Sequence, residues 1–338
     1  RDSANSVALH LGTDHTELCL APSDALGVIP QLPFIYDEPF GDSSQIPTHL
    51  VSLLARRQVS VSLSGDAGDE LFGGYNRYLL GASVWNRMRP IPRVLRQFSG
   101  DAIRWLSPNT WDTIGTLLPH HFRQPPLGDR LHKLAGVLDV SDCQDLYFRL
   151  VSHCLVPNSI VISGNEVPTW ADDVTALFAC SPRGSHSIER MMFQDLVGYL
   201  CDDILTKVDR ASMACSLETR IPMLDHRVVE YAWSLPFHMK IRDGESKWLL
   251  RRVLSRYLPL SLFQRPKQGF ALPIDRWLRG PLRDWAEELL DEQRLRNEGF
   301  LRPEPIRKIW LQHIFGRRNW QHFLWNVLMF QAWSERWV

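Results

Sequence analysis

The run VSVSL at residues 59–63 most constrains the fold, because it leads directly into an acidic loop that contains glycine. Its small and β-branched residues predict a buried strand. The next residues, SGDAGDELFGG, place Asp66, Asp69 and Glu70 close together. In open parallel sheets, ligands bind beyond the carboxyl ends of the strands. The segment therefore predicts a strand that ends at a ligand site.

Helices and strands are expected to alternate in the first part of the chain. The pattern predicts a helix, a strand (TELCL), a helical turn with a loop, and a second helix, at residues 4–12, 16–20, 22–42 and 43–57. Ser43 or Ser44 is the expected N-cap of the second helix. Such alternation is typical of an α/β protein in which helices flank a parallel sheet.

Helical patterns dominate after this part, so we expect residues 1–80 to form an α/β layer and residues 81–338 a mainly helical portion. The stretch HFLWNVLMFQAW near the C-terminus is the most apolar segment. It is shorter than the roughly 18 residues that span a bilayer and is interrupted by Asn326 and Gln331. It therefore predicts a buried core helix.

Composition excludes several classes of protein. The 338 residues carry 38 basic and 38 acidic side chains, and this balance argues against nucleic acid or an anionic membrane as main partner. Six scattered cysteines without a CxxC pair indicate reduced thiols in a cytoplasmic protein. The histidines lack HExxH or similar spacing, so we expect no zinc site.

The acidic loop has a chemical interpretation. Ser64 and Gly65 allow a sharp turn close to a ligand, and the N–H groups at the start of a following helix favour phosphate. Bare carboxylates repel phosphate, but Mg²⁺ bound by Asp69, and by Glu70 as a second acid, removes that conflict. The alternative is that Asp66 and Asp69 only form a turn or cap, and that Glu70 is an ordinary acid of a first helical turn.

Two further segments carry charges that could face a substrate. Lys267 lies between Pro266 and Gly269 in SLFQRPKQGFALPIDRW, where it could close over a site, although it could also be an ordinary solvated lysine. The segment DDILTKVDRASMACSLETRIPMLDHR (residues 202–227) contains Glu218 and Arg220 without clean helical amphipathy. Either a buried ion-pair network or a substrate-facing role fits the latter pattern.

Together with SKWLLRRVL, HLGTDHTE and YDEPFGDSSQIPT, these three segments resemble the synthetase domain of glutamine-hydrolysing asparagine synthetases. The likeness covers nearly the whole chain in the right order. It implies a sheet of the adenine-nucleotide α-hydrolase type, truncated at its N-terminus, with a large helical extension. It also implies that ATP with Mg²⁺ converts aspartate to β-aspartyl-AMP, which ammonia then converts to asparagine.

The resemblance also implies roles for individual residues. Ser64 and Gly65 would contact the nucleotide, and Asp66 would act in forming or using the adenylate. Asp69 would bind Mg²⁺, and Lys267 would neutralise the phosphates in the transition state. A further set would shape the substrate pocket, namely Glu70, Asp209, Arg210, Glu218 and Arg220.

Two family features are not found in the sequence: an SGGxDS loop and an N-terminal glutaminase domain. The chain also begins without Met inside a predicted helix. We therefore expect a piece of a longer protein, in which a glutaminase domain in cis supplies ammonia from glutamine. We expect these 338 residues alone to be inactive and to bind ATP weakly. Whether the protein is a monomer or a homodimer stays open.

Relatives of this fold also use adenylation on other carboxylates, such as a uronic acid of a surface polysaccharide, a peptide or a β-lactam precursor. The SGDAGDE and RPKQGF segments do not separate these substrates from aspartate. A catalytically silent chain that serves only in folding or association is the remaining alternative.

Overall fold

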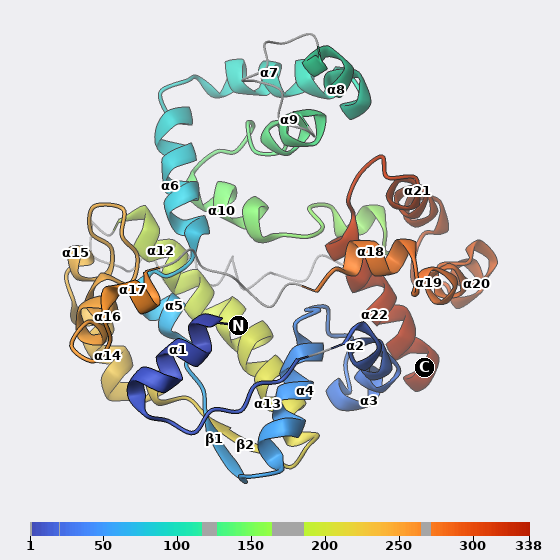
Figure 1. Cartoon of the computed structure of the whole chain (residues 1–338). Coiled ribbons are helices and arrows are strands. Elements are labelled where there is room, and N and C mark those ends of the chain that lie inside the picture. Colours follow the sequence, from blue (N-terminus) through green and yellow to red (C-terminus); the bar gives the residue numbers. More distant parts are fainter. Residues whose placement is uncertain (1, 20, 117–126, 164–185, 265–271) are drawn as a thin grey trace. The chain divides into compact units, whose positions relative to one another are not determined.

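The computed structural model describes residues 2–19, 21–116, 127–163, 186–264 and 272–338 of the chain (Figure 1). The chain divides into two compact units. Unit 1 comprises Arg1–Tyr75, Met192–Ile274 and Trp325–Val338, and unit 2 comprises Asn76–Met191 and Asp275–Leu324. Each unit therefore combines segments that are distant in the sequence.

Unit 1 contains a small parallel sheet. Strand β1 (Val61–Leu63) pairs with strand β2 (Glu218–Arg220) in parallel register, Val61 opposite Glu218 and Leu63 opposite Arg220. The pair confirms a strand of a parallel sheet within the VSVSL run, although only its last three residues, Val61–Leu63, form it. The strand β2 was not expected, because its charged residues give no apolar alternation.

Two expectations about strands are wrong. Val61 is 39% and Leu63 is 73% exposed, so β1 is not a buried strand. The described sheet has only two short strands, and too few neighbours cover them. Residues 16–19 of the TELCL segment form no strand. A strand needs a hydrogen-bonded neighbour, and none of the described residues provides one there.

Most other elements of unit 1 are helices. The predicted helix at residues 4–12 overlaps α1, which ends one residue earlier, before Gly12, and the one at 43–57 contains α4. The region 22–42 is more helical than expected, because α2, a 3₁₀ turn (Ile29–Gln31) and α3 follow one another. The helices of unit 1 are α1 (Asp2–Leu11), α2 (Pro22–Val28), α3 (Leu32–Tyr36), α4 (Gln45–Arg56), α5 (Gly68–Phe72), α13 (Thr206–Met213), α14 (His226–Ser234), α15 (Phe237–Lys240), α16 (Trp248–Leu254) and α17 (Leu260–Phe263).

The short helix α5 is held by apolar packing in unit 1. Leu71 and Phe72 are 1% and 3% exposed, and they share a cluster with Leu200, Ile204 and Ala232. Leu200 and Ile204 belong to an unusual π-helix (Asp195–Leu205) that leads directly into α13. Burial of such side chains contributes about 1.5–3 kcal/mol each. This packing connects the residues after β1 to the segment before β2.

Ser44 precedes α4 but does not cap it through its side chain. Its hydroxyl donates instead to Asp42 Oδ2 at 2.6 Å. The same carboxylate accepts a hydrogen bond from Lys207 Nζ at 2.6 Å. Ser44 thus occupies the N-cap position of α4, as predicted, but its side chain makes no hydrogen bond to the helix backbone.

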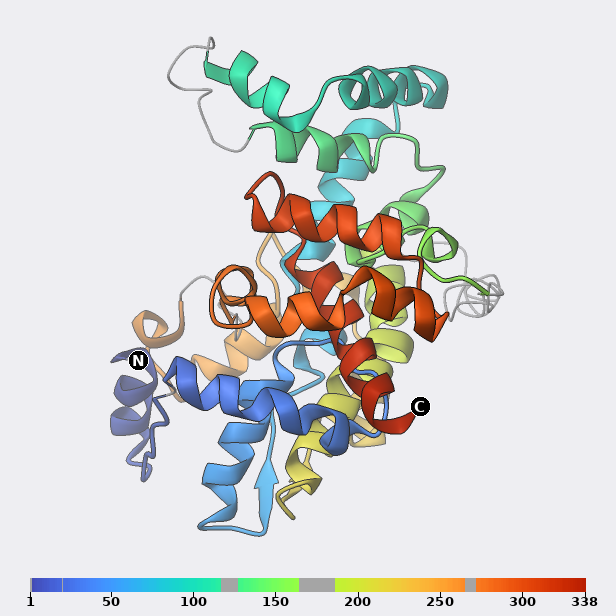
Figure 2. The ribbon, with the colours of Figure 1, turned by 90° about the vertical axis from the view of Figure 1, so that its right-hand side faces the viewer.

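Asp42, Asp203 and Lys207 form a largely buried cluster between the π-helix, α13 and the start of α4. The helices α4 and α13 lie side by side in both views (Figure 1 and Figure 2). Lys207 Nζ is closer to Asp42 Oδ2 than to Asp203 Oδ1, at 2.6 and 3.7 Å. Burial disfavours the charge of Asp42, but the charge of Lys207 outweighs it and lowers the pKa of Asp42. Burial and the charge of Asp42 raise the pKa of Asp203 to about 7.

Unit 2 consists of helices. Three further helices, α12 (Ser187–Gln194), α18 (Ile274–Arg279) and α22 (Gln321–Trp337), contribute residues to both units. The helices confined to unit 2 are α6 (Asn76–Met88), α7 (Arg93–Trp105), α8 (Pro108–Thr116), α9 (Leu127–Ala135), α10 (Cys143–Val151), α19 (Arg283–Leu289), α20 (Glu292–Glu298) and α21 (Pro303–Ile314).

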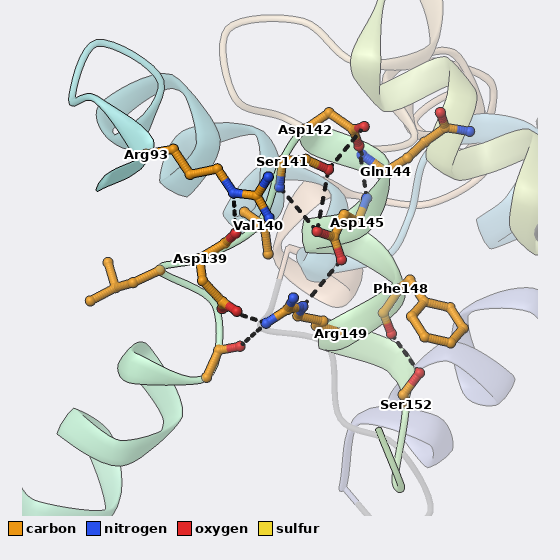
Figure 3. A network of polar contacts seen from close by, with 12 residues as sticks. Arg93, Asp139, Val140, Ser141, Asp142, Gln144, Asp145, Phe148, Arg149 and Ser152 are labelled. Carbon is orange, nitrogen blue, oxygen red and sulfur yellow. Dashed lines mark hydrogen bonds and ion pairs between the residues drawn. The ribbon is translucent and has the colours of Figure 1, made fainter. Parts of the chain in front are cut away.

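A polar network fixes the start of α10 in unit 2 (Figure 3). The carboxylate of Asp142 accepts hydrogen bonds from the backbone N–H groups of Gln144 and Asp145, as an N-cap does. The guanidinium of Arg149 reaches Asp145 at 3.1 Å and Asp139 at 2.5 Å. These contacts tie the loop before α10 to the last turn of that helix.

The prediction of a buried core helix near the C-terminus is confirmed. In α22, Leu324 and Leu328 are fully buried and Trp325 is 2% exposed. Among the helices of the described residues, none combines the length and the apolar character that crossing a bilayer requires.

The cluster around Lys207 predicts a pH-dependent stability. In the unfolded chain Asp203 loses its proton near its ordinary pKa of 3.8, but in the folded chain only near 7. Between these values the folded state binds the extra proton, so the free energy of unfolding falls as pH rises. Asp203→Asn removes this titration. As the pH rises from about 5 to about 8, the free energy of unfolding of the wild type should therefore fall relative to that of the variant.

Urea unfolding at both pH values measures this difference. Asp202→Asn, at an exposed neighbouring acid, is the matched control and should keep the wild-type dependence. If the free energies of unfolding of the wild type and of Asp203→Asn changed with pH in parallel, the extra proton would not belong to Asp203.

Candidate functional site

The acidic loop begins where β1 ends, at the carboxyl end of the parallel pair. The backbone N–H of Ser64 continues the ladder by donating to the carbonyl of Arg220 at 2.9 Å. The hydroxyl of Ser64 donates to Asp66 Oδ2 at 2.5 Å. Ala67 then adopts a left-handed conformation with φ of 68° and starts α5. The chain thus turns sharply between β1 and α5, but the left-handed residue of the turn is Ala67 and not Gly65, where the sequence had placed it.

Asp69 lies on α5 and forms an ion pair with Lys247. Lys247 Nζ is 3.1 Å from Asp69 Oδ1, with both side chains partly exposed, at 30% and 22%. Lys247 immediately precedes α16, and its backbone N–H donates to the carbonyl of Phe72 at 3.1 Å. This main-chain contact holds the start of α16 against the end of α5. The ammonium group of Lys247 and the carboxylate of Asp69 therefore lie together beside the acidic loop.

Gly74 makes room for this ion pair. Its backbone N–H donates to the carbonyl of Asp69 at 2.8 Å. A Cβ atom at position 74 would lie 2.0 Å from Asp69 Oδ1 and 2.2 Å from Lys247 Cε. Real Cβ atoms do not approach other atoms so closely, so the glycine is required for the observed geometry.

Glu70 lies beside Asp69 in the sequence but points into the core. It is 1% exposed, and the hydroxyl of Tyr75 donates to Glu70 Oε1 at 2.5 Å. Burial raises the pKa of Glu70 above its ordinary value. Burial and the nearby Glu70 also raise the pKa of the Tyr75 phenol, which therefore keeps its proton and donates. The two adjacent acids thus occupy different environments.

The remaining predicted pocket residues form two local pairs. Arg220 Nε lies 2.7 Å from Glu218 Oε1 on β2, and Arg210 Nη1 lies 2.6 Å from Asp209 Oδ2 on α13. All four side chains are between 46% and 66% exposed. The alternative of a buried ion-pair network within residues 202–227 is therefore wrong for these residues. The buried network of this region involves Lys207 and its two acids instead.

Lys267, the predicted catalytic lysine, lies outside the described residues. Lys247 was assigned no role from the sequence, and its spacing from the acidic loop gave no signal. Only its place in SKWLLRRVL, one of the segments that carry the family resemblance, could have drawn attention to it. The structure brings it to Asp69 from 178 positions further along the chain.

The site can hold a cation through few protein ligands. Within the described part of the chain, no three His, Cys, Asp or Glu side chains are grouped to bind a metal ion. Mg²⁺, however, is usually bound by one or two carboxylates together with water and substrate phosphates. The partly exposed carboxylate of Asp69 fits that mode of binding, whereas the buried Glu70 does not.

Comparison with known proteins gives a consistent result over the whole chain. A family model described as asparagine synthase matches residues 1–335. The chain is 26% identical over 338 residues to asparagine synthetase [glutamine-hydrolyzing] 1 of Bacillus subtilis (strain 168), with 99% of this chain and 49% of the relative covered.

A second relative is a putative asparagine synthetase [glutamine-hydrolyzing] of Mycobacterium tuberculosis (strain ATCC 25618 / H37Rv). It is 31% identical over 342 residues, with 100% of this chain and 48% of the relative covered. A putative asparagine synthetase [glutamine-hydrolyzing] 2 of Methanocaldococcus jannaschii is 31% identical over 210 residues, or 61% of this chain and 36% of the relative. The chain thus spans about half the length of the curated relatives that match all of it.

The close approach at Gly74 yields a prediction. Gly74→Ala should push apart Asp69 and Lys247, and it should cost about 1 kcal/mol of stability, because the crowded atoms belong to side chains that can move. Gly27→Ala is the matched control, because no atom lies within 4 Å of a Cβ there. It should be neutral or stabilise by up to about 1 kcal/mol. Urea unfolding measures both, and equal stability of Gly74→Ala and wild type would contradict the packing described.

Proposed function

Because the chain belongs to the asparagine synthase family, we propose that the full-length protein is an ATP-dependent carbon–nitrogen ligase that converts aspartate to asparagine. The observation that carries this proposal is the family match over residues 1–335. The carboxylate of Asp69 on α5 and the nearby Lys247 support it, because a carboxylate can bind the Mg²⁺ of ATP and a lysine can neutralise its phosphates.

The proposed reaction has two steps. The side-chain carboxylate of aspartate attacks the α-phosphorus of ATP, which forms β-aspartyl-AMP and releases pyrophosphate. Ammonia then attacks the activated carbonyl carbon, and AMP leaves with the former carboxylate oxygen. Activation is needed because a carboxylate is a poor electrophile for ammonia, whereas AMP is a good leaving group.

The residues of the loop have distinct tasks in this proposal. Asp69 binds Mg²⁺, which would neutralise the pyrophosphate, and Lys247 supplies a second positive charge beside it. Ser64 and Gly65 contact the nucleotide at the turn after β1. Asp66, oriented by the hydroxyl of Ser64, acts in forming or using the adenylate. One fixed donor or cation of this kind contributes about 3–4 kcal/mol to stabilising a transition state.

Other assignments rest on the family alone. Lys267 is proposed as a further phosphate-neutralising lysine. The exposed pairs Asp209–Arg210 and Glu218–Arg220 are proposed to border the substrate pocket, where their charges could meet polar groups of the substrate. The sheet is proposed to be of the adenine-nucleotide α-hydrolase type, which binds ATP at the carboxyl ends of its strands.

The nitrogen source is proposed to be glutamine. The relatives that match the whole chain are about twice as long, and their names include glutamine hydrolysis. A glutaminase domain in the same polypeptide would release ammonia, which would travel to the adenylate without escaping to solvent. The present 338 residues would then supply the amidating half of the enzyme.

Exchange of labelled pyrophosphate into ATP tests the first step. Full-length protein should catalyse this exchange only when aspartate and Mg²⁺ are present. Asp69→Asn should lower the exchange rate by about 10²–10³. Asp101→Asn, at an acid that is 75% exposed in unit 2, is the matched control and should keep the wild-type rate.

A panel of carboxylates decides the substrate. Release of AMP with a uronic acid or a peptide, and none with aspartate, would contradict the assignment to asparagine synthesis. A normal exchange rate in Asp69→Asn would contradict the metal assignment while leaving the substrate unaffected.

A further inference from the structure

The helix α5 is too short to determine its own orientation. It has five residues, and an isolated helix of that length is unstable because nucleation is unfavourable. Its rotation about its own axis must therefore be fixed by tertiary contacts. Any such rotation would move Asp69, because the side chain projects from that axis.

Adjacent residues of a helix project about 100° apart. In α5 this separation directs Asp69 to Lys247, at the partly exposed surface, and Glu70 into the core, where it is 1% exposed. The position of one acid therefore sets the direction of the other. A contact that fixes the side chain of Glu70 therefore also fixes the direction in which the side chain of Asp69 projects.

The chain folds back on α5 to make such a contact. Gly73 ends the helix in the left-handed conformation, with φ of 67°, and a Cβ there would lie 2.7 Å from Ile241 Cδ1. After this turn, the hydroxyl of Tyr75 donates to Glu70 Oε1 at 2.5 Å. The ring of Tyr75 packs edge-on against Tyr199, with centroids 6.0 Å apart. Tyr75 is thus held by the π-helix while it holds Glu70.

We propose that Tyr75 is a positioning residue: through its hydrogen bond to Glu70 it fixes the rotation of α5, and so places the carboxylate of Asp69 for the Mg²⁺-bound phosphates of ATP. Glu70 accepts this hydrogen bond and does not touch the substrate or the metal. The inference rests on the proposed function for its ligand, but the geometry it describes is independent of turnover.

Three variants separate this role from direct ligation. Tyr75→Phe removes the donor, and Glu70→Leu removes the acceptor. Glu70→Gln keeps an acceptor oxygen that the Tyr75 hydroxyl can reach, so it should rescue the hydrogen bond. If Glu70 were a metal ligand instead, Glu70→Gln would be as harmful as Asp69→Asn, because an amide oxygen lacks the charge.

The kinetic test uses full-length protein and the aspartate-dependent exchange of pyrophosphate into ATP. Tyr75→Phe and Glu70→Leu should raise KM for MgATP and lower kcat/KM by about ten- to hundredfold, as expected for a misplaced ligand. Glu70→Gln should stay within about threefold of the wild type. Tyr231→Phe, at a tyrosine that is 58% exposed, is the matched control for loss of a hydroxyl.

Two outcomes would overturn the proposal: wild-type KM and kcat in Tyr75→Phe, or a loss in Glu70→Gln equal to that in Asp69→Asn. Thermal unfolding accompanies the kinetics, because a purely structural role would lower stability without raising KM.

A crystal structure of Tyr75→Phe gives a readout that needs no turnover. The separation between Lys247 Nζ and Asp69 Oδ1, 3.1 Å in the wild type, should lengthen. An unchanged pair would overturn the positioning role. If the pair lengthens but wild-type protein shows no aspartate-dependent exchange, the positioning role stands and the proposed function fails.

Discussion

The pairing of β1 with β2 is the constraint on which the candidate site depends. Three residues on each side join parts of the chain that are 157 positions apart, and the ladder continues to Ser64. Because the strands are parallel, the loop after β1 leaves the sheet at the same end as the residues after Arg220. The packing of Leu71 and Phe72 against the π-helix then holds α5 directly behind that end.

A partly buried carboxylate is stabilised either by a nearby cation or by binding a proton, and unit 1 contains examples of both. At the loop, Lys247 balances Asp69 where solvent still reaches the pair. In the second cluster, Lys207 pairs with Asp42, while Asp203 binds a proton at higher pH than an ordinary aspartate does. The carboxylates of the two arrangements are similarly exposed, but Lys247 is more exposed than Lys207, at 30% against 12%.

The features that were predicted correctly are those that depend on residues close together in the sequence. The strand before Ser64, the sharp turn, the start of α5 and the apolar helix at the C-terminus all follow from patterns within about 15 residues. The TELCL segment failed because strand-forming residues form a strand only when a partner strand lies beside them. Ser44 occupies the predicted N-cap position of α4, but its hydroxyl donates to Asp42, two residues before it, and not to the helix.

Long-range contacts explain the rest of what the sequence could not reveal. The acidic partner of Lys247 lies 178 positions away, so no local spacing marks this lysine. Lys207 has one local partner, Asp203 four positions before it, but its closer partner, Asp42, lies 165 positions away. The strand β2 has the sequence ETR, which resembles a loop until β1 lies beside it. Glu70 and Asp69 are neighbours in the sequence, and the local pattern did not reveal that Glu70 is buried while Asp69 stays partly exposed.

The central claim is that Asp69 meets a cation bound to the phosphates of a nucleotide. Anomalous diffraction from a crystal of the full-length protein with ATP and Mn²⁺ in place of Mg²⁺ tests it most directly. The account predicts a manganese peak about 2.1 Å from an oxygen of Asp69 and in contact with phosphate oxygens. A manganese-nucleotide complex bound elsewhere, with Asp69 still paired to Lys247, would contradict it.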